Sequence, residues 1–120
     1  MKTCLIVEDS HIVRRITHRM VADLGYEVVE VANGQIALME CEKQKFSVIL
    51  LDWSMPVMDG VEFLKKFRET DITTKVIFCS VEDDPKLIDQ AIQFGADGFI
   101  SKPFDSHKIR IAFDEQGLVD

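Results

Sequence analysis

The sequence is poor in cysteine and has no long apolar stretch. Cys4, Cys41 and Cys79 are odd in number and form no CxxC pair, which excludes a disulfide scaffold and indicates structural thiols. No apolar run approaches the roughly 20 residues that a membrane-spanning helix needs, and the first residues lack a signal-peptide pattern. We therefore expect a cytoplasmic protein without a membrane span.

Basic residues are too few to balance the acidic ones. The chain has 14 Lys and Arg against 21 Asp and Glu, a formal net charge of −7 at pH 7. Such a chain repels the phosphate backbone, so direct binding to nucleic acid is not expected. Apolar residues make up 47% of the 120 residues, enough for a packed core and against disorder. The length predicts one domain over residues 1–120.

Short β-branched runs alternate along the chain with segments of helical period. The expected strands are residues 4–7, 26–31, 46–51, 75–79 and 98–100. Each is followed by a helical pattern, at residues 13–24, 36–45, 61–67 and 83–95 and, after the last strand, around Ile109, Ala112 and Phe113, where the end is expected to fray. This alternation predicts a doubly wound α/β fold, with a five-stranded parallel sheet and helices on both faces.

Polar residues follow four of the expected strands. Glu8 and Asp9 follow the first strand, Asp52 the third, Ser80 the fourth and Lys102 the fifth. In doubly wound sheets, the loops at the carboxyl ends of the strands form the ligand site. Three clustered carboxylates repel one another unless a cation neutralises them, and Mg²⁺ is the hard ion that suits oxygen ligands.

Such a cluster predicts a phosphoryl-accepting site. An aspartate carboxylate beside a bound metal can attack phosphorus and form an acyl phosphate. Lys102 and the metal would stabilise the equatorial oxygens, and the hydroxyl of Ser80 would donate to one of them. Acidic residues after strands are often only helix caps or solvated loops, but their coincidence at several strand ends favours the phosphoryl site.

The whole chain resembles the receiver domain of two-component response regulators. The resemblance rests on separated, collinear motifs: VEDS at residues 7–10, LDWSMPVMDG at 51–60, Ser80, and KPF at 102–104. The chain is similar in particular to the CheY-like single-domain regulators, and Trp53, directly after Asp52, resembles the chemotaxis members. The resemblance implies a flavodoxin-like three-layer sandwich with strand order 2-1-3-4-5, and no output domain.

The resemblance also implies the roles of the site residues. By matching position, Asp52 is the phosphoryl acceptor. Glu8, Asp9, Asp52 and the backbone carbonyl of Ser54 hold Mg²⁺, for which Mn²⁺ is expected to substitute. Lys102 pairs with the phosphoryl group, and its peptide bond to Pro103 is expected to be cis, the less common isomer for X–Pro bonds in general.

Further positions match the family's switch and timing residues. Ser80 is the switch hydroxyl, and Phe99 is expected to swing inward when Ser80 moves toward the phosphoryl oxygens. Because Phe99 has no hydroxyl, packing alone would favour its inward state, and the alternative is a plain core aromatic. Ser54 and Glu82 match positions that tune the loss of the phosphoryl group; Glu82 could order a water or be a solvated loop charge.

The partners implied are a sensor histidine kinase or a histidine phosphotransfer protein as donor, and a downstream protein. The downstream protein is expected on the face formed by the helix at 83–95, the strand at 98–100 and the last helix. The first helix carries a basic face that either steers an acidic partner or forms local ion pairs. Its residues are His11, Arg14, Arg15, His18 and Arg19. A monomer or weak dimer is expected.

The expected function is a stand-alone signalling switch, with a chemotaxis or motility output favoured over a phosphorelay role. Its own chemistry would be limited to self-phosphorylation from small donors and slow self-dephosphorylation, so we do not expect an enzyme. A Mg²⁺-dependent aspartyl phosphohydrolase would need an acid two residues after the nucleophile, where this chain has Ser54. A flavodoxin-like cofactor binder would need a phosphate loop in place of Glu8 and Asp9.

Overall fold

The computed structural model describes residues 2–53, 57–81 and 85–119. Five strands form one parallel sheet in the order β2-β1-β3-β4-β5. The strands are β1 (Thr3–Val7), β2 (Glu27–Val31), β3 (Val48–Asp52), β4 (Lys75–Ser80) and β5 (Gly98–Ser101). The predicted doubly wound fold and its strand order are thereby confirmed.

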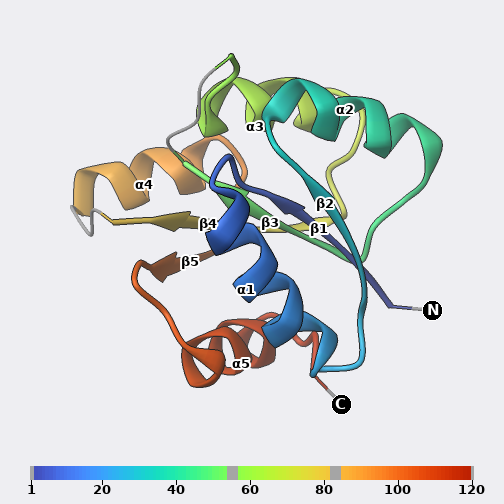
Figure 1. Cartoon of the computed structure of the whole chain (residues 1–120). Coiled ribbons are helices and arrows are strands. Elements are labelled where there is room, and N and C mark those ends of the chain that lie inside the picture. The colour runs from blue at the N-terminus through green and yellow to red at the C-terminus, as the bar shows by residue number, and fades with distance from the viewer. Residues whose placement is uncertain (1, 54–56, 82–84, 120) are drawn as a thin grey trace.

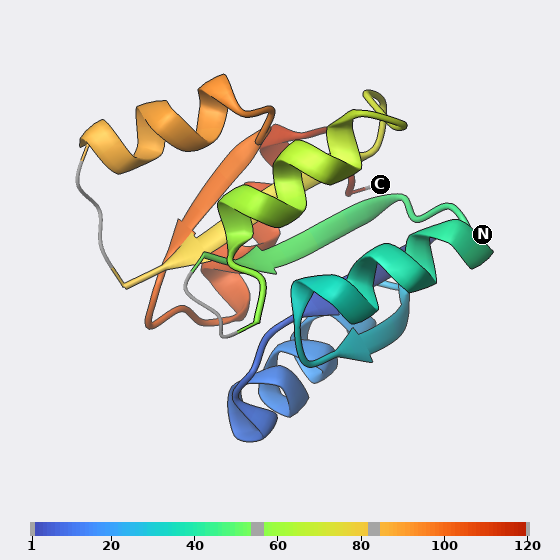
Figure 2. The same cartoon turned by 90° about the horizontal axis from the view of Figure 1, so that it is seen from above.

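Helices cover both faces of the sheet. They are α1 (His11–Ala22), α2 (Gly34–Lys43), α3 (Gly60–Arg68), α4 (Pro85–Gln93) and α5 (Ser106–Glu115). Helices α2, α3 and α4 lie on one face, and α1 and α5 lie on the other (Figure 1). The view from above shows the same three layers, with the twisted sheet between the two groups of helices (Figure 2).

The central strand β3 is buried along its whole length. All five residues of β3 are buried, because β1 and β4 flank it and helices cover both of its faces. Alternate side chains enter two separate cores: Ile49 and Leu51 pack toward α2, α3 and α4, and Val48 and Leu50 pack toward α1 and α5. Strand β2, at the edge of the sheet, is only partly buried.

Helices α1, α2 and α3 begin one or two residues before the first residue of the predicted helical pattern, because side-chain caps begin them earlier. Ser10, Asn33, Asp59 and Asp105 each accept a hydrogen bond from a backbone N–H three residues on. Helix α2 thus begins at Gly34 rather than Ile36. Strand β3 begins at Val48 rather than residue 46.

The end of the chain packs against the body of the domain. The hydroxyl of Tyr26 donates to the backbone carbonyl of Leu118, and Leu118 and Val119 pack on the core shared by α1 and α5. Gly117 adopts a φ of 72°, a left-handed conformation that ends the helix. These contacts join residues far apart in the sequence, so the weak local pattern did not reveal them.

Two sequence predictions concern burial and membrane topology. The thiols of Cys4 and Cys79 are buried, which fits the structural role expected of them, and Cys41 is partly buried. Burial raises the pKa of Cys79 to about 12 and that of Cys41 to about 11, so both thiols stay protonated near neutral pH. Within the described ranges, no helix is both long and apolar enough to cross a bilayer.

Candidate functional site

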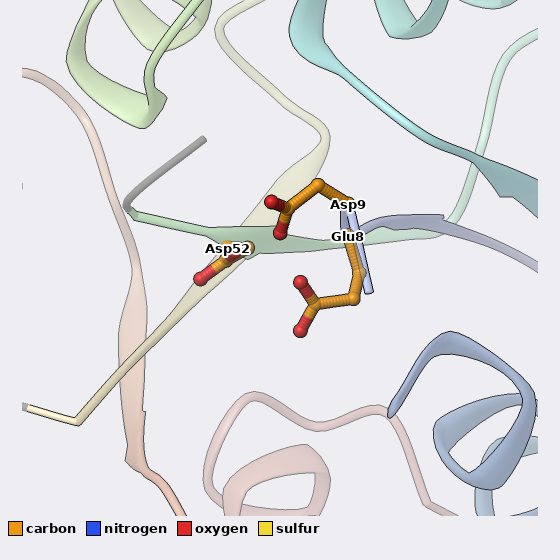
Figure 3. Close-up of side chains that lie close together, drawn as sticks. All are labelled: Glu8, Asp9 and Asp52. Atoms are coloured by element: carbon orange, nitrogen blue, oxygen red, sulfur yellow. The ribbon is translucent and has the colours of Figure 1, made fainter. Parts of the chain in front are cut away.

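Three carboxylates meet at the carboxyl edge of the sheet. Glu8 and Asp9 occupy the turn after β1, and Asp52 is the last residue of β3. Because Val7 pairs with Leu51 in the adjacent strand, this turn lies beside Asp52. A carboxylate oxygen from each of the three residues lies within 4.8 Å of the others (Figure 3). Glu8 and Asp52 are buried and Asp9 is exposed, so the cluster faces solvent on one side.

Lys102 brings one positive charge into this cluster from the far side of β4. Its ammonium donates to Oε1 of Glu8 at 2.6 Å and to Oδ1 of Asp52 at 3.1 Å. Its backbone N–H donates to the carbonyl of Ser80 at 2.8 Å, and the Lys102–Pro103 peptide bond is cis, the isomer that the resemblance implied. Burial alone lowers the pKa of Lys102, but the hydrogen bonds and charges of Glu8 and Asp52 outweigh it and raise the pKa above 10.5.

The donor set of the cluster fits a hard divalent cation. One ammonium against three carboxylates leaves two negative charges uncompensated, which is the charge that a divalent ion supplies. The converging ligand atoms are carboxylate oxygens, the type that Mg²⁺ prefers. Two of the implied residues, Ser54 with its backbone carbonyl and Glu82, lie outside the described residues.

A cleft of about 680 Å³ opens over the cluster. Its floor includes Asp52 and Lys102, and its walls come from the turn after β1 and from the ends of β4, α3 and α4. Ser80, the last residue of β4, is buried and lines the cleft. The fold therefore brings Glu8, Asp9, Asp52, Ser80 and Lys102 to one site, as the sequence predicted.

An aromatic row runs from this site to the edge of the sheet, and Phe78 at its centre was not singled out from the sequence. The Trp53 ring lies 5.0 Å from that of Phe78, and the Phe78 ring lies 4.8 Å from that of Phe99, centroid to centroid. Phe78 is fully buried and pairs with Phe99 in the strand register. In the sequence, Phe78 looked like any apolar strand residue; only the register places it between the other two rings.

The basic face of α1 is partly neutralised by Glu30 on β2. The carboxylate of Glu30 accepts from Arg14 at 3.1 Å and from Arg15 at 3.2 Å, and it also contacts Nδ1 of His18. Burial raises the pKa of Glu30, but hydrogen bonds from His18 and Arg14 and the charge of Arg15 outweigh it, so the pKa lies below 4.5. Local ion pairs thus account for much of this face, while Arg15 and Arg19 remain exposed.

A parallel sheet of order 2-1-3-4-5 with three carboxylates at its carboxyl edge defines a flavodoxin-like domain with a candidate cation site, and comparison with known proteins gives its family. Residues 4–114 match the model of the response regulator receiver domain. The chain belongs to this family. CheY-like members of the family are signalling switches rather than classical enzymes.

Individual relatives agree with this assignment. The chain is 35% identical over 116 residues to the chemotaxis protein CheY of Listeria monocytogenes, covering 96% of this chain and 98% of that protein. It is 33% identical over 108 residues to the sporulation initiation phosphotransferase F of Bacillus subtilis, covering 90% of this chain and 87% of that protein.

Solved structures agree as well. The chemotaxis response regulator CheY4 of Vibrio cholerae superposes with a TM-score of 0.91 at 32% identity, covering 96% of this chain and 98% of that one. The receiver domain of a Pseudomonas aeruginosa sensor histidine kinase, solved with a magnesium ion coordinated in its active site cleft, has a TM-score of 0.85 at 27% identity. That match covers 97% of this chain and 98% of the Pseudomonas aeruginosa domain.

Proposed function

We propose that this chain is a phosphoacceptor switch that takes a phosphoryl group on Asp52 from a histidine kinase or a histidine phosphotransfer protein. The observation that supports this most directly is the setting of Asp52. Its carboxylate lies within 4.8 Å of those of Glu8 and Asp9 and 3.1 Å from the ammonium of Lys102, at the floor of an open cleft. This arrangement suits an acceptor whose added negative charge must be compensated.

The transfer needs one bond to form and one to break. A carboxylate oxygen of Asp52 attacks the phosphorus, and the bond from phosphorus to the donor imidazole breaks, leaving its electron pair on the imidazole nitrogen. Glu8, Asp9, Asp52 and the Ser54 carbonyl would hold Mg²⁺, which when bound offsets negative charge on the phosphoryl oxygens. Lys102, already directed at Asp52, donates to one phosphoryl oxygen, and the hydroxyl of Ser80 donates to another.

The signal would pass from this site to a binding face at the other edge of the sheet. The phosphoryl group adds a charge of about −1.5 to −2, and Ser80 moves toward its oxygens. Phe99, packed against Phe78, then turns into the space above β4. A shallow hollow of about 170 Å³ lined by Phe99, Ile111 and Ala112, together with exposed Ile92 on α4, supports a protein target at this face.

The donor would approach along α1. Ile12 and Ile16 are 71% and 51% exposed on this helix, next to exposed Arg19. Apolar residues beside positive charges suit a partner with an acidic, partly apolar surface. This supports the steering role for the part of the basic face that Glu30 does not neutralise.

A chemotaxis-type output and a phosphorelay role both have relatives that support them. CheY proteins and the sporulation initiation phosphotransferase F are similar to this chain at nearly the same identity. We favour the chemotaxis-type output because several of the similar proteins are chemotaxis CheY proteins. A pull-down with and without a phosphoryl mimic separates the two: an output protein captures its target when phosphorylated, whereas a relay intermediate captures a phosphotransfer protein.

The acceptor role is tested by intact mass. The purified chain is incubated with Mg²⁺ and acetyl phosphate, and an adduct of ~80 Da is expected. Asp52→Asn should abolish the adduct. Asp59→Asn is the matched control, because Asp59 also lines the cleft but lies outside the carboxylate cluster and keeps its capping ability as asparagine. An adduct that persists in Asp52→Asn would contradict the proposal.

A further inference from the structure

Arg14 connects the turn that carries two of the clustered carboxylates to strand β2. Its Nη1 donates to the backbone carbonyl of Glu8 at 2.9 Å, and its Nε donates to Oε1 of Glu30 at 3.1 Å. Its Nη2 lies 3.1 Å from Nδ1 of His11. The side chain is only 15% exposed, so it is packed into this position rather than extended into solvent.

The contact with Glu8 holds one peptide unit of the turn. The N–H of Glu8 donates to the carbonyl of Val31 at 3.1 Å, so Glu8 is tied to β2 on one side and to Arg14 on the other. The carbonyl that Arg14 contacts belongs to the peptide bond leading to Asp9. Its direction therefore sets how the chain leaves the sheet and where the carboxylate of Asp9 lies relative to Asp52.

Glu30 keeps Arg14 in place. It stands on β2, so its backbone is fixed by the sheet, and it also accepts from Arg15 and contacts His18. A guanidinium group can donate in two directions at once with fixed geometry, which a lysine ammonium on a flexible stem does less well. The Glu30–Arg14 pair thus works as a brace between the edge strand and the turn.

We propose that Arg14, held by Glu30, is a positioning residue for the Mg²⁺ site, acting through its hydrogen bond to the carbonyl of Glu8. This inference rests on the proposed function in taking Mg²⁺ as the ion of the cluster. It predicts an effect opposite in sign to simple electrostatics. A cation near the cluster repels Mg²⁺, so removing its charge alone tightens binding, whereas losing the brace weakens binding.

The experiment compares Arg14→Met with Arg15→Met in the full chain. Both substitutions remove one positive charge from α1 and one hydrogen bond to Glu30, but only Arg14 contacts the carbonyl of Glu8. Mg²⁺ is titrated at constant ionic strength, and the fluorescence of Trp53, which follows Asp52 directly, gives the Kd. Arg14→Met is expected to raise the Kd about tenfold, and Arg15→Met to leave it unchanged or lower it.

The inference is overturned if the Kd for Mg²⁺ rises less than about threefold in Arg14→Met, or if it rises equally in Arg15→Met. Melting in EDTA is measured alongside, and lower stability with an unchanged Kd also overturns it. If Arg14→Met does not fold, the Kd for Mg²⁺ is measured in Arg14→Lys, which keeps the charge. A rise of less than about threefold in that variant overturns the inference in the same way. A wild-type chain that gives no Mg²⁺ response removes the proposed metal site itself, whereas a wild-type response that Arg14→Met retains contradicts only this inference.

Discussion

Lys102 and Glu8, 94 positions apart in the sequence, are joined by a hydrogen bond of 2.6 Å. The same ammonium lies 3.1 Å from Asp52, so one lysine neutralises part of the charge of two buried carboxylates. This contact spans the sheet from β5 to β1 and links the carboxylate cluster to the strand that carries Phe99.

Lys102→Met is expected to lower stability in EDTA by about 1–2 kcal/mol, because two buried carboxylates lose their shared counter-charge. Mg²⁺ should then raise the melting temperature more in the variant than in the wild type, since no ammonium competes for Glu8 and Asp52. Differential scanning calorimetry with and without Mg²⁺ measures both effects. Lys108→Met is the control, and equal Mg²⁺ shifts in Lys102→Met and wild type would contradict the prediction.

Val57 adopts a φ of 71°, a left-handed conformation that is strained for a β-branched residue. Its side chain is 74% exposed, so little packing is lost on substitution. Asparagine tolerates this conformation, and Val57→Asn is expected to stabilise the chain by about 1 kcal/mol. Val81→Asn is the control, because Val81 is 75% exposed and does not have a positive φ. Urea unfolding measures the free energy of unfolding of both variants. The same change in both would show that the left-handed backbone of Val57 stores no strain.

Arg68 ties the end of α3 to two loops. It donates two hydrogen bonds to the carbonyl of Gly95, one each to the carbonyls of Asp71 and Thr74, and one to the carboxylate of Asp97. Arg68→Met should cost about 2–4 kcal/mol, because three partly buried carbonyls lose a charged donor.

Chemical denaturation measures this loss. Arg110→Met, at an exposed position of α5, should change the free energy of unfolding by less than about 0.5 kcal/mol. If both variants lose a comparable free energy of unfolding, the hydrogen bonds of Arg68 contribute little to stability.

Asp71 accepts hydrogen bonds from Thr73 and Thr74 in the loop before β4. Burial raises its pKa, but these hydrogen bonds and the charge of Lys45 outweigh it and lower the pKa from 3.8 to about 2. Since the folded pKa is depressed, the contribution to stability is complete above pH 3.8 and is lost as the pH falls toward 2.

The stability difference between wild type and Asp71→Asn should therefore be constant near neutral pH and shrink below pH 3.8. Thermal unfolding at a series of pH values measures it. A stability difference that grows as the pH falls would contradict a lowered pKa for Asp71 in the folded state. Asp114→Asn, at an exposed position of α5, controls for the general effect of removing one negative charge.

Phe99→Ala removes the ring that packs 4.8 Å from Phe78, and it should cost roughly 2 kcal/mol. Because Phe78 also contacts Trp53, the variant should keep the Trp53 fluorescence response to Mg²⁺ but alter the further response to acetyl phosphate. Phe94→Ala is the matched control, since Phe94 packs against the same core from the end of α4. A response to acetyl phosphate that matches the wild type, together with unchanged partner binding, removes Phe99 from the switch.

Much of the fold and site follows from the sequence because its signals are local. Apolar runs and helical periods are read within a few residues, and they predicted every strand and helix along with Glu8, Asp9, Asp52, Ser80 and Lys102 at the strand ends. Strand order was different: the alternation predicted a parallel sheet, but the order 2-1-3-4-5 came from the resemblance to receiver domains. Helix starts were displaced because caps such as Asn33 act through side-chain hydrogen bonds that apolar spacing does not record.

Only the tertiary structure decided which side chains of the predicted helices and strands contact one another. Nothing in the spacing of the basic residues on α1 distinguishes Arg14, which contacts the carbonyl of Glu8, from Arg15, which does not. Nothing in the apolar run of β4 distinguishes Phe78, which lies between two aromatic rings. Such contacts join residues distant in the chain, and strand register and helix orientation determine them; these arise only when the sheet pairs and its two cores pack.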